Sequence, residues 1–146
     1  MNNLTELEEL YVTFQRSVSW EWQKRMDLLV SSSQAMILRS LAVNGPQNAS
    51  TLAERLRITP GAVTSLSDKL IASGYAHRNK DPNDRRIVLL EITDQGREIL
   101  LQFKEENKNV MKQLFSGLPE EDINHLVRIY RHVLKNIATG KVVENE

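Results

Sequence analysis

The sequence predicts a mainly α-helical fold that carries one small β-hairpin. Over most of the chain, apolar residues recur at spacings of three and four, the period of a helix with one buried face. The exception lies between residues 75 and 92, where turn chemistry precedes a short apolar run rich in β-branched residues. We therefore expect helices on both sides of a single hairpin, within one domain that covers residues 1–146.

A long amphipathic helix is predicted first, over about residues 4–30. Its apolar stripe comprises Leu4, Leu7, Tyr11, Phe14, Val18, Trp22 and Met26. Trp20 lies roughly half a turn away from this stripe. Two interpretations of Trp20 stay open. It packs on a second surface, against the neighbouring lobe or another subunit, or it forms a wall of a ligand pocket.

The next two helices are short. Ser31 to Ser33 predict the start of one, and the run from Asn44 to Pro46 predicts its end. Its predicted buried residues are Met36, Ile37 and Leu41. Asn48 is an N-cap for the next helix, Ala49–Leu56, and the turn after it is formed by Arg57 and Ile58. The face of this helix that we expect to be buried comprises Leu52, Ala53 and Leu56.

The fourth predicted helix has the features of a DNA recognition helix. Thr59 is its N-cap, Pro60 suits its first position, and Gly74 ends it. A buried stripe is formed by Val63, Leu66 and Leu70. The opposite face is small and polar, as in a helix that enters a major groove, whereas an ordinary surface helix carries more Glu and Lys. The predicted DNA-contacting residues are Thr59, Pro60, Gly61, Ala62, Thr64, Ser65, Asp68 and Lys69.

A hairpin with arginines near its tip follows this helix-turn-helix. The turn begins with Asp81, Pro82, Asn83 and Asp84, which are typical turn residues. Its predicted strands are residues 75–79 and 87–92. By itself Arg85-Arg86 would indicate only a solvated turn. After a helix-turn-helix, the same pair predicts a DNA-binding wing, which completes a winged helix-turn-helix lobe over about residues 34–92.

Two helices complete the chain. Thr93 is predicted to start a long helix, which Gly117 and Pro119 interrupt. The last helix opens with three acids that suit the helix dipole, and residues 139–146 are expected to fray. Its apolar stripe comprises Ile123, Leu126, Val127, Tyr130, Val133, Leu134 and Ile137. One small lobe cannot bury the long apolar stripes of residues 4–30 and 93–138, so we expect these helices to form a homodimer.

The charge distribution agrees with binding to nucleic acid. The formal net charge of the chain is zero. Residues 46–90 nevertheless carry seven basic and four acidic side chains, a net charge of +3, and local charge governs attraction to phosphates. The segments on either side are slightly acidic.

Several function classes lack their sequence signals. The chain has no cysteine, which excludes disulfides, thiolate zinc sites and a cysteine-based redox sensor. His77, His125 and His132 do not have the spacing of a metal site. No nucleophile–base pair and no phosphate-binding glycine loop is found, so we expect neither an enzyme nor a cofactor. Without a signal peptide or a membrane-spanning apolar run, a cytoplasmic protein is expected.

The segments 51–75, 81–86 and 92–96 together resemble the MarR (multiple antibiotic resistance regulator) family, and the likeness extends over about residues 5–138. The resemblance implies winged-helix homodimers that are usually repressors and are often released by small, frequently aromatic, molecules. It also implies that Arg86 enters the minor groove and that Asp84 braces it. Both roles are physically reasonable. Residues i and i+2 share a strand face, so Asp84 can orient the Arg86 guanidinium, and narrow minor grooves attract arginine.

The chain departs from this pattern at two positions. Many members have a basic residue at the position of Ser65, and some have arginine at that of Asn83. Base recognition therefore depends less on arginine–guanine contacts here, and the operator does not follow by analogy. The main functional prediction is a sequence-specific double-stranded DNA-binding regulator. The alternative is a winged-helix protein-interaction module that does not bind DNA.

Overall fold

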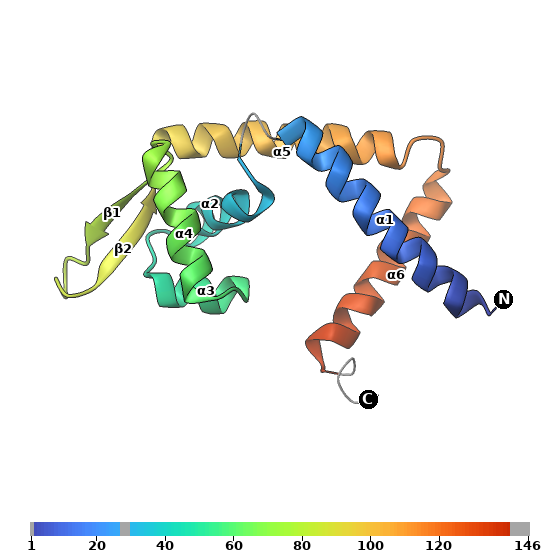
Figure 1. Ribbon diagram of the computed structural model, residues 1–146, viewed down its shortest axis with the longest axis horizontal. Coiled ribbons are helices and arrows are strands. Elements are labelled where there is room, and N and C mark those ends of the chain that lie inside the picture. Colours follow the sequence, from blue (N-terminus) through green and yellow to red (C-terminus); the bar gives the residue numbers. More distant parts are fainter. Residues whose placement is uncertain (1, 27–29, 141–146) are drawn as a thin grey trace. The chain divides into compact units, whose positions relative to one another are not determined.

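The computed structural model describes residues 2–26 and 30–140 (Figure 1). Its elements are α1 (Asn3–Met26), α2 (Ser32–Asn44), α3 (Ala49–Leu56), α4 (Pro60–Ala72), β1 (Ala76–Lys80), β2 (Val88–Ile92), α5 (Asp94–Leu114) and α6 (Glu120–Ala138). The predicted class, mainly helical with a two-stranded wing, is confirmed. Residues 27–29 of the first predicted helix and 141–146 of the predicted frayed tail lie outside the described residues. The chain divides into two compact units, Met1–Val110 and Met111–Glu146.

The helix starts of the winged lobe follow local sequence signals. The side chains of Ser31, Asn48 and Thr59 each accept a hydrogen bond from the backbone N–H three residues later, at 3.1, 2.8 and 3.1 Å. These bonds satisfy N–H groups that have no partner inside the helix. Pro60 occupies the first turn of α4, and Gly74, with φ 80°, follows its last turn. The predicted starts of α2, α3 and α4 are confirmed.

The core of the lobe lies where α2, α3, α4 and the hairpin meet, and α5 contributes its first turns. The largest fully buried side chains are Ile37, Leu38, Leu41, Leu52, Val63 and Leu70. One expectation was wrong. Met36 is exposed and Leu38 takes its place, because residues 37, 38 and 41 share the face of α2 that meets α4. In α4, Ser67 is buried as well, and Leu66 is half-buried and packs against the core.

The hairpin is antiparallel and starts one residue later on each strand than predicted. Its register pairs Ala76 with Ile92 and ends at residues 80 and 88. Tyr75 lies between α4 and β1, and its N–H donates to the carbonyl of Leu70, near the end of α4, at 2.9 Å. The N–H of Ile87 donates to a carbonyl inside the wing turn, at 3.0 Å.

A third backbone segment pairs with the hairpin, which the sequence did not indicate. Gln47 and Leu90 exchange two backbone hydrogen bonds of 3.1 and 2.8 Å. The buried side chain of Gln47 also donates to the carbonyl of Ser40, at 3.0 Å. The base of the wing is therefore anchored to the loop between α2 and α3.

The predicted start of α5 is also a junction. The Thr93 hydroxyl donates to the carbonyl of Gly74 at 2.7 Å and accepts from the N–H of Gly96 at 3.0 Å. A Cβ atom on Gly96 would lie 2.1 Å from the carbonyl oxygen of Tyr75, so glycine is required here. Residues 93–96 thus hold the end of α4, the end of β2 and the start of α5 together.

The long helices keep much of their apolar surface exposed. On α1 the exposed large apolar side chains are Leu4, Leu7, Leu10, Tyr11, Val12, Phe14 and Trp20. On α6 they are Val127, Ile129, Tyr130, Val133, Leu134 and Ile137. The predicted break between α5 and α6 is confirmed, with φ 84° at Gly117 and Pro119 at the N-cap of α6. None of the helices in the described part of the chain is long and apolar enough to cross a membrane.

Candidate nucleic-acid interface

The outer face of α4 and its N-cap are exposed, as predicted for a recognition helix. The exposed predicted residues are Thr59, Pro60, Gly61, Thr64, Ser65, Asp68 and Lys69, and Ala62 is half-buried. A Cβ at Gly61 would meet nothing within 4 Å, so no other part of the described chain covers this turn of the helix. The Thr64 hydroxyl donates to the carbonyl of Pro60 at 3.1 Å, which leaves its lone pairs available to a donor.

Asp68 has a partner that the sequence did not indicate. Its carboxylate accepts a hydrogen bond from the guanidinium of Arg78 on β1, with Oδ1 and Nη2 2.5 Å apart. Both side chains are largely exposed, so the pair adds little to stability. It does neutralise the only acid among the predicted contact residues of α4, and it connects that helix to the wing.

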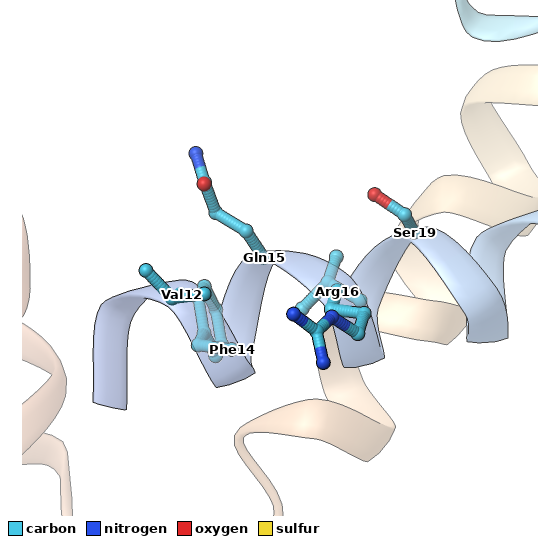
Figure 2. A pocket seen from close by; sticks show the side chains of 6 residues that line it. Val12, Phe14, Gln15, Arg16 and Ser19 are labelled. Atoms are coloured by element: carbon cyan, nitrogen blue, oxygen red, sulfur yellow. The ribbon is translucent and has the colours of Figure 1, made fainter. Parts of the chain in front are cut away.

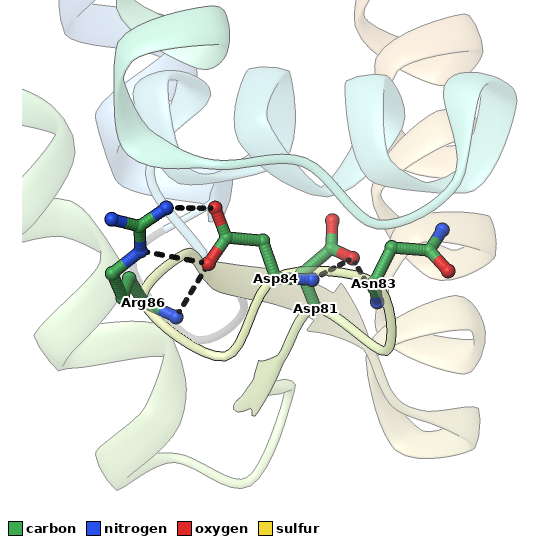
Figure 3. A network of polar contacts seen from close by, with 4 residues as sticks. All are labelled: Asp81, Asn83, Asp84 and Arg86. Carbon is green, nitrogen blue, oxygen red and sulfur yellow. Dashed lines mark hydrogen bonds and ion pairs between the residues drawn. The ribbon is translucent and has the colours of Figure 1, made fainter.

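The wing turn is organised by aspartate side chains (Figure 3). The carboxylate of Asp81 accepts from the N–H groups of Asn83 and Asp84, at 2.8 and 3.3 Å. This is the Asx-turn chemistry expected from the sequence. It holds the backbone that leads into Arg85 and Arg86.

The predicted contact between Asp84 and Arg86 is present (Figure 3). Oδ1 of Asp84 accepts from Nε and from the backbone N–H of Arg86, both at 3.1 Å, and Oδ2 accepts from Nη2 at 3.3 Å. The hydrogen bonds from the Arg86 side chain, and then from its backbone, lower the pKa of Asp84 below its usual range. The Arg86 side chain remains 90% exposed, so it is oriented and still accessible. Arg85 is exposed as well.

Trp20 does not line the cavity that α1 shares with its neighbours. It is 61% exposed, and Nζ of Lys24 lies 5.3 Å from the centroid of its ring. Trp22 lines that cavity instead, and its ring centroid is 6.3 Å from that of Phe103 on α5. Periodicity placed Trp22 correctly on the apolar stripe but gave no sign of an adjoining cavity.

This cavity has a volume of about 240 Å³. It is lined by Trp22, Ser32, Ala35, Met36, Arg39, Leu100, Phe103, Lys104 and Asn107. Two buried polar atoms on its wall, Nε1 of Trp22 and Oδ1 of Asn107, have no hydrogen-bond partner among the described residues. The side chains of Arg39 and Lys104 line the same cavity.

A second hollow, of about 600 Å³, lies along α1 alone (Figure 2). It is lined by Val12, Phe14, Gln15, Arg16, Val18 and Ser19. A single helix cannot enclose a ligand, so this hollow is an open part of the α1 surface. Among the described residues, no group of three or more His, Asp or Glu side chains is arranged to hold a metal ion.

Comparison with known proteins also indicates a winged helix-turn-helix protein. The MarR family pattern matches residues 30–88. The HTH-type transcriptional repressor MdtR of Bacillus subtilis (strain 168) is 32% identical over 64% of this chain and 61% of its own length. The chain spans only about three fifths of the length of the curated relatives that match it first.

Solved structures extend the likeness to nearly the whole chain. The transcriptional regulator BldR from Sulfolobus solfataricus is 29% identical, with a TM-score of 0.71 over 92% of this chain and 95% of that one. A mutant of MarR from Escherichia coli, complexed with operator DNA, is 23% identical, with a TM-score of 0.75 over 91% and 96% of the two chains. At 23% identity, the MarR structure is evidence for the fold alone. From its sequence pattern, its relatives and its fold, the chain belongs to the MarR family of winged helix-turn-helix transcriptional regulators.

Proposed function

We propose that this protein is a cytoplasmic, sequence-specific double-stranded DNA-binding regulator that represses transcription from a pseudo-palindromic operator. The observation that carries the proposal is the exposed Arg86, oriented by Asp84 at the tip of a wing beside an exposed, small-residue recognition helix. An exposed, oriented arginine at the tip of a wing can enter a minor groove, and a helix with small outer side chains can enter a major groove. The relative named as a repressor and the similar structure solved with operator DNA add support. Membership in a family of regulators agrees with the prediction that the chain is not an enzyme.

A salt series tests this function directly. Binding to fluorescent duplex DNA would be measured by anisotropy between about 50 and 200 mM salt, where proteins that contact several phosphates lose much of their affinity. We expect a steep loss of affinity with salt, and tighter binding to an operator found by genome-wide mapping than to mixed sequence. A protein-interaction module would show no salt-sensitive binding to either duplex.

A homodimer is part of the proposal. Both α1 and α6 expose at least six large apolar side chains, and such exposed apolar surfaces mark interaction sites, for which a second copy of the chain is the commonest partner. Two recognition helices related by a two-fold axis would then contact two half-sites.

We also propose that the cavity beside Trp22 binds a small effector. At about 240 Å³ it is smaller than the roughly 300–1,000 Å³ of sites for drug-sized ligands, so a single-ring compound fits best. Arg39 and Lys104 favour a carboxylate, and the ring of Phe103 favours an aromatic ligand. The indole N–H of Trp22 and Oδ1 of Asn107 would pair with an acceptor and a donor on that ligand.

Tryptophan fluorescence distinguishes a ligand site in the cavity beside Trp22 from a ligand site at Trp20. Substituted benzoates would be titrated into Trp20→Phe, in which Trp22 reports, and into Trp22→Phe, in which Trp20 reports. A site at the cavity predicts a response in the first variant and little in the second. The reverse result would favour a pocket at Trp20. An effector that acts as a regulator should also change DNA affinity by about 5- to 150-fold, the usual range of coupling between sites.

A further inference from the structure

Arg57, in the turn between α3 and α4, has a backbone conformation that arginine rarely adopts. Its φ and ψ are 55° and 44°, in the left-handed region. Among the described residues it is the one non-glycine residue with a positive φ. For an L-amino acid this conformation brings Cβ too close to the following carbonyl oxygen, and glycine is the usual occupant.

The backbone at this position has a clear structural role. The N–H of Ile58 donates to the carbonyl of Ala53 at 3.1 Å, and the N–H of Arg57 donates to that of Glu54 at 3.4 Å. Together these bonds end α3 and give partners to the carbonyls of Ala53 and Glu54 in its last turn. The Ile58 side chain then packs against the core of the lobe.

The side chain of Arg57 has no such role. It is exposed, and it makes no hydrogen bond or ion pair with any residue that the structure describes. Glycine would make the same backbone bonds without the strain. A strained residue whose side chain does nothing for the fold points to a function for that side chain.

We propose that Arg57 binds a backbone phosphate of duplex DNA next to the recognition helix. This inference rests on the proposed DNA-binding function. Arg57 lies two residues before Thr59, the N-cap of α4, where the partial positive charge of the helix end also favours an anion. In Figure 1 the α3–α4 turn and the tip of the β1–β2 hairpin both lie at the lower edge of the winged lobe. The guanidinium suits a phosphate because its planar fork of donors matches two phosphate oxygens.

The proposal predicts that stability and DNA affinity respond in opposite directions at this residue. Asparagine tolerates the left-handed conformation, so Arg57→Asn should fold more stably than the natural chain in urea denaturation. The strain relieved corresponds to at most about a 5- to 30-fold change in the unfolding equilibrium constant. The same variant should bind a mixed-sequence duplex about fivefold more weakly at 0.15 M salt, with a salt slope lower by about 1.

Two further variants serve as controls. Arg57→Lys keeps the charge and the strain, so it should retain most of the affinity and the full salt slope. Arg55→Gln removes the same charge from the exposed last turn of α3, where no strain is present. We expect a smaller loss of affinity from Arg55→Gln than from Arg57→Asn, because only the latter removes the proposed phosphate contact.

The outcomes distinguish failure of the proposed DNA-binding function from failure of the role proposed for Arg57. If the natural chain binds no DNA, the proposed function fails and the role of Arg57 fails with it. If the natural chain binds DNA and Arg57→Asn keeps its full affinity and salt slope, only the role of Arg57 is overturned. Equal losses from Arg55→Gln and Arg57→Asn would also overturn it, since general charge would then explain both. An Arg57→Asn variant no more stable than the natural chain would remove the strain on which the inference rests.

Discussion

At the scale of single residues, the wing contains one carboxylate, Asp84, that orients one guanidinium, that of Arg86. Asp84 makes two hydrogen bonds to the side chain of Arg86 and one to its backbone, while the arginine stays accessible. An arginine that is already oriented loses less conformational entropy when it enters a groove than one that moves freely. The contribution of Asp84 to binding is therefore expected to be favourable although its charge repels phosphates.

Alanine variants test this arrangement. Arg86→Ala should weaken operator binding by roughly 1–3 kcal/mol, as expected for an arginine in a groove. Arg85→Ala, if that residue touches phosphate, should weaken binding equally on all sequences and lower the salt slope by about 1. Asp84→Ala should partly reproduce the effect of Arg86→Ala. Tighter binding by Asp84→Ala in an anisotropy titration would mean that charge repulsion outweighs orientation.

The pKa of Asp84 gives a second residue-scale prediction. It is lowered chiefly by the side-chain hydrogen bonds of Arg86 and then by the Arg86 backbone N–H. A lowered folded-state pKa means that the contact is fully present above the unfolded pKa and is lost as pH falls through the folded one. The Asp84–Arg86 contact should therefore stay intact between about pH 5 and 8. NMR titration of the Asp84 carboxyl carbon should give a low midpoint that rises partway in Arg86→Ala, and an unchanged midpoint would contradict this cause.

At the scale of elements, the winged lobe depends on close contacts where elements join. Gly96 lies at the start of α5, against the backbone that leads from α4 into β1. The neighbouring hydroxyl of Thr93 bonds to both sides of this junction. The orientation of α5 on the lobe is thus set within a few residues, and any added atom has to displace backbone.

Two glycine substitutions make a matched test. In Gly96→Ala the new Cβ would approach the Tyr75 carbonyl oxygen to 2.1 Å, so we expect a loss of about 1–3 kcal/mol or more in the free energy of unfolding. In Gly61→Ala the Cβ meets open space inside a helix, so we expect a gain of about 0.5–1 kcal/mol. Urea denaturation measures both. Similar effects at the two positions would show that the junction is not tightly packed.

At the scale of the whole molecule, the exposed apolar faces of α1 and α6 are the surfaces on which the proposed homodimer would form. Light scattering at micromolar concentration should give about twice the chain mass of 16.7 kDa. Replacing Leu7 and Leu134, both exposed, with glutamate would separate the copies if these faces form the interface. A stable, folded monomer of the natural chain at that concentration would contradict the dimer.

The operator should reflect the symmetry of that dimer. Two-fold related recognition helices contact half-sites whose centres lie about 10 bp apart, or a multiple of that. Thr64→Ala and Ser65→Ala should then alter base preference within each half-site more than they alter the salt dependence. Footprinting that showed one asymmetric half-site occupied by a single chain would be incompatible with this arrangement.

The sequence by itself determined the features that depend on near neighbours in the chain. The caps at Ser31, Asn48, Thr59 and Thr93 involve hydrogen bonds across three residues, so each start could be predicted from a few neighbouring letters. The brace between Asp84 and Arg86 spans only two residues. Within the winged lobe, helical periodicity likewise predicted the buried residues Leu52, Ala53, Val63 and Leu70 without any knowledge of what covers them.

Only the tertiary structure decided which distant residues meet. Arg78 pairs with Asp68 across ten residues, and Leu90 pairs with Gln47 across a still longer separation. Trp22, rather than Trp20, borders a cavity because of how α1 lies against its neighbours, which the period of α1 cannot specify. Such contacts depend on the packing of complete elements, and the same local pattern is compatible with many packings. Local interactions determine where helices and strands begin and end, whereas the fit of their side chains in three dimensions decides which residues share a site.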